Sequence, residues 1–147
     1  MQVKLKLKHP SVKVPTYATD GSGCFDIYAD SLGDLNCVSV FENNPLVVPT
    51  GLFFEVPEGH VLLIFSRSGH GFKNDVRLAN CTGIIDSDYR NEILVKLTAD
   101  SKGALVVKKG DRIAQGMIIP YPKVQFVVTD ELSTTERNLG GFGSTGA

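Results

Sequence analysis

The chain has 147 residues, of which 42% are hydrophobic and 21% are charged, and its formal net charge is −1. These values are typical of one globular domain with its own core, and the near-zero charge argues against duplex nucleic acid as a partner. No apolar run approaches the ~20 residues that cross a membrane, and residues 1–8 lack the apolar core of a signal peptide, so we expect a cytoplasmic protein with no membrane partner.

The three cysteines, Cys24, Cys37 and Cys81, are widely spaced and form no CxxC pair. An odd and scattered set argues against a disulfide framework and against a zinc site. We expect small, buried thiols instead.

Period-two patterns predict strands in the first half of the chain. Val3, Leu5 and Leu7 alternate with lysines, which indicates a half-buried strand over residues 2–8. An irregular, turn-rich connection is expected over residues 10–23. Short strands separated by proline, glycine and asparagine turns are then predicted at residues 24–29, 38–41, 46–48, 52–56 and 61–65.

Asp26 is the unusual residue of these strands, because it lies between apolar neighbours. A carboxylate in such a place is costly unless it is paired, hydrogen-bonded or close to a cation. The sequence therefore predicts a partner for Asp26.

The second half of the chain continues the strand pattern. The one helix candidate follows Ser68, and Gly69 and Gly71 weaken it. Many short strands, no internal repeat and no helical pattern above ten residues predict a single all-β domain, a sandwich or a barrel. The further strands are expected at residues 93–97, 105–107, 112–115, 116–120 and 124–128.

Residues 80–92 are the stretch that the rest of the chain is expected to present. Asp86, Ser87 and Asp88 favour a turn and predict the tip of a β-hairpin. Gly83 leaves the backbone of the incoming arm open, and Tyr89 places a flat ring beside the acidic tip. Such a hairpin could hold a small planar ligand, although an ordinary surface hairpin with a solvated turn has the same pattern.

The C-terminal segment is rich in glycine and carries groups that bind phosphate. Arg137, Ser144 and Thr145 supply donors, and Phe142 is an isolated aromatic residue among glycines. A lid that stacks its ring on a base and holds phosphates would need this combination. A disordered tail is the other interpretation.

Residues 66–69 form a second candidate for anion binding, with a surface turn as the alternative. A serine nucleophile is not predicted, because the Gly-x-Ser-x-Gly elbow is absent, and no HExxH zinc motif occurs. Asp26, Asp86 and Asp88 remain as acid–base or metal groups. Oxygen ligands of this kind suit Mg²⁺, which also uses water and substrate phosphates.

Five stretches in this order resemble the motifs of the trimeric dUTP pyrophosphatases (dUTPases). Each stretch is modest evidence alone, whereas five in order, ending in a glycine-rich run with one phenylalanine, are highly specific. The stretches are residues 21–29, 66–73, 80–92, 110–115 and 137–146.

The resemblance implies an all-β, distorted jelly-roll subunit in a homotrimer, with active sites built from three chains and the C-terminal lid exchanged between subunits. It implies one domain over residues 1–147, divided into a β-core (1–128) and a flexible lid (129–147). The implied reaction is Mg²⁺-assisted hydrolysis of dUTP to dUMP and pyrophosphate, which keeps uracil out of DNA and supplies dUMP for dTMP synthesis.

The resemblance also implies roles for individual residues. Asp86 would orient and deprotonate the attacking water, and Asp26 would bind Mg²⁺ through water. Tyr89 would pack under the deoxyribose. The other residues of the implied substrate-binding set would bind uracil, bind the phosphates or form the lid. That set is Arg67, Ser68, Gly69, Asn80, Gly83, Ile84, Ile85, Tyr89, Leu94, Gln115, Arg137, Phe142, Gly143, Ser144 and Thr145.

Two positions depart from the family pattern, because Asn91 and Asn138 stand where glycine is usual. Asparagine tolerates the left-handed conformation better than most residues, so the turns can keep their geometry. Two alternatives stay open, a dCTP deaminase-like enzyme of the same fold and a non-catalytic dUTP-binding regulatory trimer. The complete glycine-rich tail argues against the first, and the presence of Asp86, Arg137 and Phe142 argues against the second.

Overall fold

Short strands make up nearly all the regular structure of the computed structural model, which describes residues 1–33, 35, 37–100, 103–142 and 144. These residues include a single helix, α1 (Ser68–Asn74), so the all-β prediction is confirmed. The strands are β1 (Lys4–Leu7), β2 (Thr16–Tyr17), β3 (Phe25–Tyr28), β4 (Cys37–Phe41), β5 (Leu46–Pro49), β6 (Leu52–Glu55), β7 (His60–Phe65), β8 (Val76–Leu78), β9 (Thr82–Ile85), β10 (Leu94–Ala99), β11 (Ala104–Lys108) and β12 (Arg112–Pro120).

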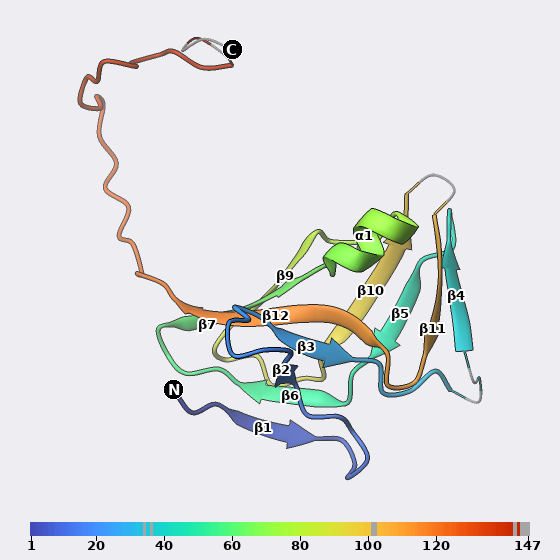
Figure 1. The fold of residues 1–147 in the computed structure, drawn as a ribbon. Coiled ribbons are helices and arrows are strands. Elements are labelled where there is room, and N and C mark those ends of the chain that lie inside the picture. Colours follow the sequence, from blue (N-terminus) through green and yellow to red (C-terminus); the bar gives the residue numbers. More distant parts are fainter. Residues whose placement is uncertain (34, 36, 101–102, 143, 145–147) are drawn as a thin grey trace.

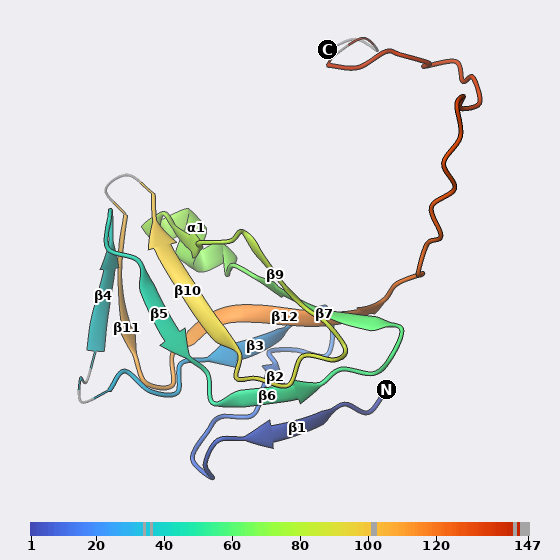
Figure 2. The same ribbon diagram turned by 180° about the vertical axis from the view of Figure 1, so that it is seen from behind.

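The strands form antiparallel sheets that pack into one body. The largest sheet has the order β2-β3-β12-β7-β9, and a second has the order β5-β10-β8. Two pairs, β1-β6 and β11-β4, complete the described sheets. Helix α1 lies at one end of this body, where it contacts β8 and β11 (Figures 1 and 2).

The core lies between the sheets and is filled by aliphatic side chains. Val95 and Leu97 of β10 are buried while Lys96 between them is exposed, which is the alternation of a strand with one face on the core. In the largest sheet, Ile27 of β3 and Leu62 of β7 are fully buried. Each such side chain contributes about 1.5–3 kcal/mol to the free energy of unfolding.

The hairpin predicted around Asp86 is wrong. Strand β9 pairs with β7, whereas β10 pairs with β5 and β8, so residues 86–93 connect two sheets. Burial decides this outcome. Gly83 lets β9 lie directly against Ile64 of β7. Ile93, which is 1% exposed, donates its backbone N–H to the carbonyl of Leu52 in β6.

The strand predicted over residues 124–128 is also wrong. Strand β12 ends at Pro120, and the following residues run away from the body (Figures 1 and 2). Phe126 and Val128 are 89% and 97% exposed, so the apolar pattern has no partner among the described residues. Pro120 and Pro122 lack the N–H groups that a continuing ladder needs. The division of core from lid at residue 128 stays a prediction.

Two smaller expectations also need correction. The connection over residues 10–23 contains the short strand β2, which pairs with β3. Cys24 is half-buried, while Cys37 and Cys81 are exposed, so the prediction of buried thiols is wrong for the latter two. Cys81 has a φ of 61°, which places it in a tight turn at the surface between β8 and β9.

Candidate active site

Two predicted site residues, Asp26 and Gln115, meet where β3, β12 and β7 lie side by side. In the sheet register Asp26 of β3 is opposite Gln115 of β12, and Gln115 is opposite Phe65, the last residue of β7. The Gln115 side chain donates from Nε2 to the carbonyl of Ser66 at 2.9 Å. Residues 66–69 therefore begin beside Asp26 and Gln115.

Asp26 has the cationic partner that the sequence predicted, and the structure supplies two such partners, Arg67 and Arg112. Asp26 is 8% exposed, and its Oδ1 lies 3.3 Å from Nε of Arg67. Its Oδ2 accepts a hydrogen bond of 3.3 Å from Nη1 of Arg112. Two guanidinium groups around one carboxylate leave a net positive charge, which favours an anion such as phosphate.

Arg112 is a residue that sequence reasoning missed. It lies in the quoted stretch 110–115, where only Gln115 was assigned a role. The signal that could have found it is the need of buried Asp26 for a cation, since strands β3 and β12 are paired.

His70 of α1 is a second missed residue. It lines a pocket of about 190 Å³ with Arg67, Asp111, Arg112 and part of β11. Within the described residues its buried Nδ1 has no hydrogen-bond partner. Burial lowers the pKa of His70, the Arg67 charge lowers it further, and Asp111 opposes them. A neutral imidazole therefore stands next to the two guanidinium groups.

Ser68 and Gly69 form the exposed start of α1, directly after Arg67. Both residues are exposed, and their neighbour Arg67 contacts Asp26. The structure thus brings together Asp26, Gln115 and the predicted phosphate-binding residues of the second stretch.

Asp86 and Tyr89 lie in the connection between β9 and β10, at a different place. Thr82 at the start of β9 pairs with Phe65, two residues before Arg67, whereas Asp86 follows the other end of β9. Asp86 lines an open pocket of about 620 Å³ that also includes Arg90 and Tyr121. Tyr89 is 39% exposed and donates its hydroxyl to the carbonyl of Glu92 at 3.2 Å.

The residues predicted to bind the uracil base differ in their exposure to solvent. Ile84 and Leu94 are 66% and 56% exposed, and Asn80 is exposed in the turn before β9. Ile85 is half-buried. Gly83 is buried with its open side against Ile64, so a segment of the same chain already approaches its backbone.

The C-terminal residues lie far from both clusters (Figures 1 and 2). Arg137 and Ser144 line one hollow within the segment itself, together with Gly140. The Phe142 ring is fully exposed. Gly143 and Thr145, which were also assigned to the lid, lie outside the described residues.

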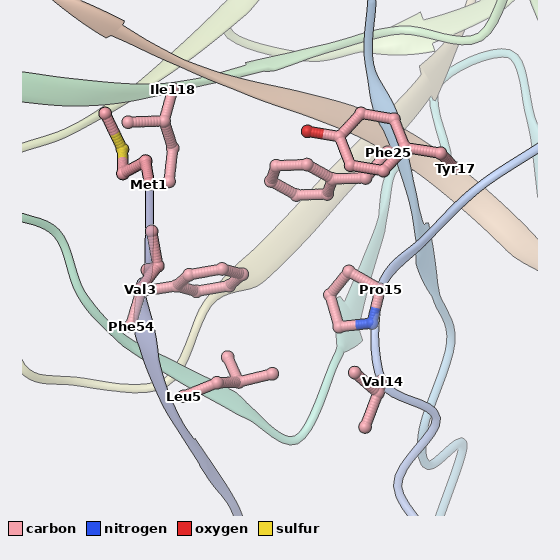
Figure 3. A pocket seen from close by; sticks show the side chains of 9 residues that line it. All are labelled: Met1, Val3, Leu5, Val14, Pro15, Tyr17, Phe25, Phe54 and Ile118. Atoms are coloured by element: carbon pink, nitrogen blue, oxygen red, sulfur yellow. The ribbon is translucent and has the colours of Figure 1, made fainter. Parts of the chain in front are cut away.

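A further hollow of about 430 Å³ has apolar walls and lies beside β1, which pairs only with β6 in the described sheets. Figure 3 shows the side chains that form it, among them the rings of Tyr17, Phe25 and Phe54. The lining residues are Met1, Val3, Leu5, Val14, Pro15, Tyr17, Phe25, Phe54 and Ile118.

Metal binding can be tested against these side chains. No group of three or more His, Cys, Asp or Glu side chains suited to a metal occurs among the described residues. Asp26 offers a single carboxylate beside phosphate-type donors. This fits Mg²⁺, which takes most of its ligands from water and substrate phosphates, and it does not fit a metal that needs a complete protein cage.

Among the described residues, no helix has the length and apolarity to cross a membrane.

Comparison with known proteins places the chain in a family. The dUTPase family model matches residues 10–146. The deoxyuridine 5′-triphosphate nucleotidohydrolase of Nautilia profundicola is 38% identical over 146 residues, and that of a Hydrogenobaculum species is 40% identical over the same length. Each match covers 99% of both chains. The chain belongs to the dUTPase family.

A solved structure of similar shape comes from Staphylococcus bacteriophage 80alpha. That dUTPase, solved with dUpNHpp, has a TM-score of 0.85, 24% sequence identity and 99% coverage of both chains. The match confirms the all-β, dUTPase-like fold that the resemblance implied.

Proposed function

We propose that the protein is a dUTP diphosphatase, which hydrolyses dUTP to dUMP and pyrophosphate. Family membership over residues 10–146 supports this activity. The observation that carries it is the cationic pair of Arg67 and Arg112 around buried Asp26, next to Gln115, since a triphosphate needs such donors. In the cytoplasm this reaction would keep uracil out of DNA and supply dUMP for dTMP synthesis.

The phosphate end of dUTP would bind Arg67, Ser68, Gly69 and Gln115. The guanidinium of Arg67 can leave Asp26 for the stronger charge of a phosphate, because the pair lies at 3.3 Å and is partly open to solvent. Asp26 would then hold Mg²⁺ through water. The metal, when bound, supplies charge that stabilises the transferred phosphate oxygens.

The reaction itself would use Asp86 as a general base. Its carboxylate is exposed at the end of β9, where it can orient a water molecule for attack on the α-phosphorus and accept the proton. Positioning and fixed charges supply most of the remaining catalysis in phosphoryl transfer.

The nucleoside end would bind along β9 and the connection that follows it. Asn80 and the backbone around Gly83, Ile84, Ile85 and Leu94 would contact uracil. Rejection of cytosine follows from reversed donors and acceptors, since an unpaired buried polar group costs about 1–3 kcal/mol. Tyr89 would pack under the sugar and leave no room for a 2′-hydroxyl.

We infer that three copies of the chain build each site in a homotrimer. The phosphate cluster, Asp86 and the C-terminal residues lie apart within one chain, so no single chain completes the site. The exposed apolar side chains of Phe126 and Val128 support exchange of the C-terminal segment, and the apolar hollow beside β1 is a surface that could receive it (Figure 3).

In this assembly the lid would close over a neighbouring site. Arg137, Ser144 and Thr145 would hold phosphates, Gly143 would add a backbone donor, and the Phe142 ring would stack on the base.

The proposal is tested by pyrophosphate release with Mg²⁺ from dUTP, dCTP, dTTP and UTP, with the Asp86→Asn variant alongside. We expect rapid release from dUTP alone and its loss in the variant. Ammonia release from dCTP would indicate the deaminase alternative. Binding of dUTP without turnover would indicate the regulatory trimer.

A further inference from the structure

The connection that carries Asp86 and Tyr89 is held to the body at its far end. The hydrogen bonds of Arg90 stay inside the connection, since its Nη1 donates to the carbonyls of Ser87 and Tyr89 at 2.6 and 3.0 Å. Glu92, by contrast, reaches out of it. The Glu92 side chain is only 14% exposed.

The Glu92 carboxylate binds two groups from distant parts of the chain. Its Oε1 accepts a hydrogen bond of 2.9 Å from the backbone N–H of Gly51. Its Oε2 lies 3.0 Å from Nζ of Lys8. The half-exposed ammonium of Lys8 adds little, whereas a shielded hydrogen bond from a backbone amide to a carboxylate is charge-assisted and short.

Gly51 is a rigid partner for this carboxylate. Its φ is +69°, and a Cβ at this position would lie 2.6 Å from Val12 Cγ2 and 3.0 Å from Asp30 Oδ2. The Asp30 side chain is itself held by His9, whose Nε2 is 2.9 Å from Oδ2. The backbone that binds Glu92 is therefore packed on a buried, hydrogen-bonded layer.

The same residue also holds the Tyr89 ring. The phenol O–H donates to the backbone carbonyl of Glu92 at 3.2 Å. The direction of the ring thus depends on the position of Glu92, and the position of Glu92 depends on the contact of its side chain with Gly51.

We propose that Glu92 is a positioning residue that fixes the Tyr89 ring and thereby sets the selection of deoxyribose over ribose. The inference rests on the proposed function, because it deepens the role given there to Tyr89. Glu92 does not touch the substrate. A ring that rejects one hydroxyl group must not yield by even a fraction of an ångström, so the residue that anchors it controls specificity.

The protein is expected to fold without the Glu92 carboxylate. Ile93, the next residue, is anchored independently. Its N–H donates to the carbonyl of Leu52 at 2.9 Å, and its own carbonyl accepts from the buried Thr50 hydroxyl at 2.7 Å. Glu92→Ala therefore loosens the ring and leaves β10 in place.

The test compares kcat/KM for dUTP and for UTP in the full-length protein with Mg²⁺. We expect Glu92→Ala to reduce the dUTP-over-UTP ratio about tenfold or more, while inhibition by pyrophosphate stays within about twofold. Glu92→Gln keeps an oxygen for the Gly51 N–H and should retain the ratio within about threefold. Lys8→Met is the matched control and should leave the ratio unchanged.

A double-mutant cycle tests the link to the ring. Tyr89→Phe removes the hydroxyl, so Glu92→Ala should change the ratio little further in that background. Additive effects of the two substitutions, or an unchanged ratio in Glu92→Ala, would overturn the inference. A wild-type protein that releases no pyrophosphate from dUTP would refute the proposed function itself, which separates the two failures.

Discussion

The Asp26 carboxylate and the Arg67 guanidinium meet at 3.3 Å, and this contact joins β3 to the segment that follows β7. Arg112 contacts the other carboxylate oxygen, also at 3.3 Å. One buried acid thus holds two cations at the end of the largest sheet. We expect it to contribute both to folding and to the arrangement of the phosphate donors.

Replacing this acid gives the first prediction. Asp26→Asn leaves the two guanidinium groups without their anion, so it should lower the free energy of unfolding by about 1–3 kcal/mol. It should also raise the KM for dUTP, because Mg²⁺ would lose the carboxylate proposed to hold it through water. Urea unfolding and steady-state kinetics check both effects.

Asp100→Asn is the control for Asp26→Asn, because it removes a pair with Arg77 at the surface, where the two side chains are 55% and 41% exposed. Exposed pairs contribute little, so stability should barely change. An Asp26→Asn protein as stable and active as the wild type would contradict the role of the cluster.

His70 predicts a pH dependence of stability. Burial and the Arg67 charge lower its pKa below the usual 6.5. As the pH falls through 6.5, the unfolded chain binds a proton at this residue and the folded chain does not, so folding stability falls until the lower, folded-state pKa is reached. Above 6.5 the residue is neutral in both states and has no effect.

The measurement is the melting temperature of the wild type and of His70→Asn between pH 5 and pH 8. The variant should lose part of the acid-side decrease. His60→Asn replaces a histidine that lies outside this pocket and serves as the control. Identical acid-side slopes in the wild type and His70→Asn would count against the assignment.

Two glycines with similar backbone angles give a matched pair of variants. Gly51 and Gly59 have φ values of +69° and +73°. A Cβ at Gly51 would clash with Val12, whereas nothing lies within 4 Å of a Cβ at Gly59. Gly59→Ala should cost about 1 kcal/mol from backbone strain alone, and Gly51→Ala about 1–3 kcal/mol more from overpacking. Equal losses in chemical denaturation would contradict this account of the Gly51 packing.

Local patterns were sufficient to predict most strands. The alternation of Val3, Leu5 and Leu7 identified β1, and the turn residues separated the strands that follow. The need of Asp26 for a cation was visible as well, because burying an unpaired carboxylate is costly in any fold.

Contacts between distant residues could not be predicted in the same way. The pairing of β9 with β7 depends on the fit of Gly83 against Ile64, which no local window contains. Phe126 and Val128 have a strand pattern but no partner strand in the part of the chain that the structure describes. Arg112 and His70 line the same pocket because β12 and α1 come together in the fold, and their distance in the sequence hides this proximity.

The central claim, that each active site is built from several chains, is tested most directly by mixing two inactive variants. The Asp86→Asn variant and the Arg137→Ala variant are each expected to be unable to hydrolyse dUTP. If Asp86 and Arg137 of one site come from different chains, co-expressed or co-refolded trimers should recover about one quarter of wild-type activity by random assortment. Mixtures that stay as inactive as either variant alone would contradict a shared site.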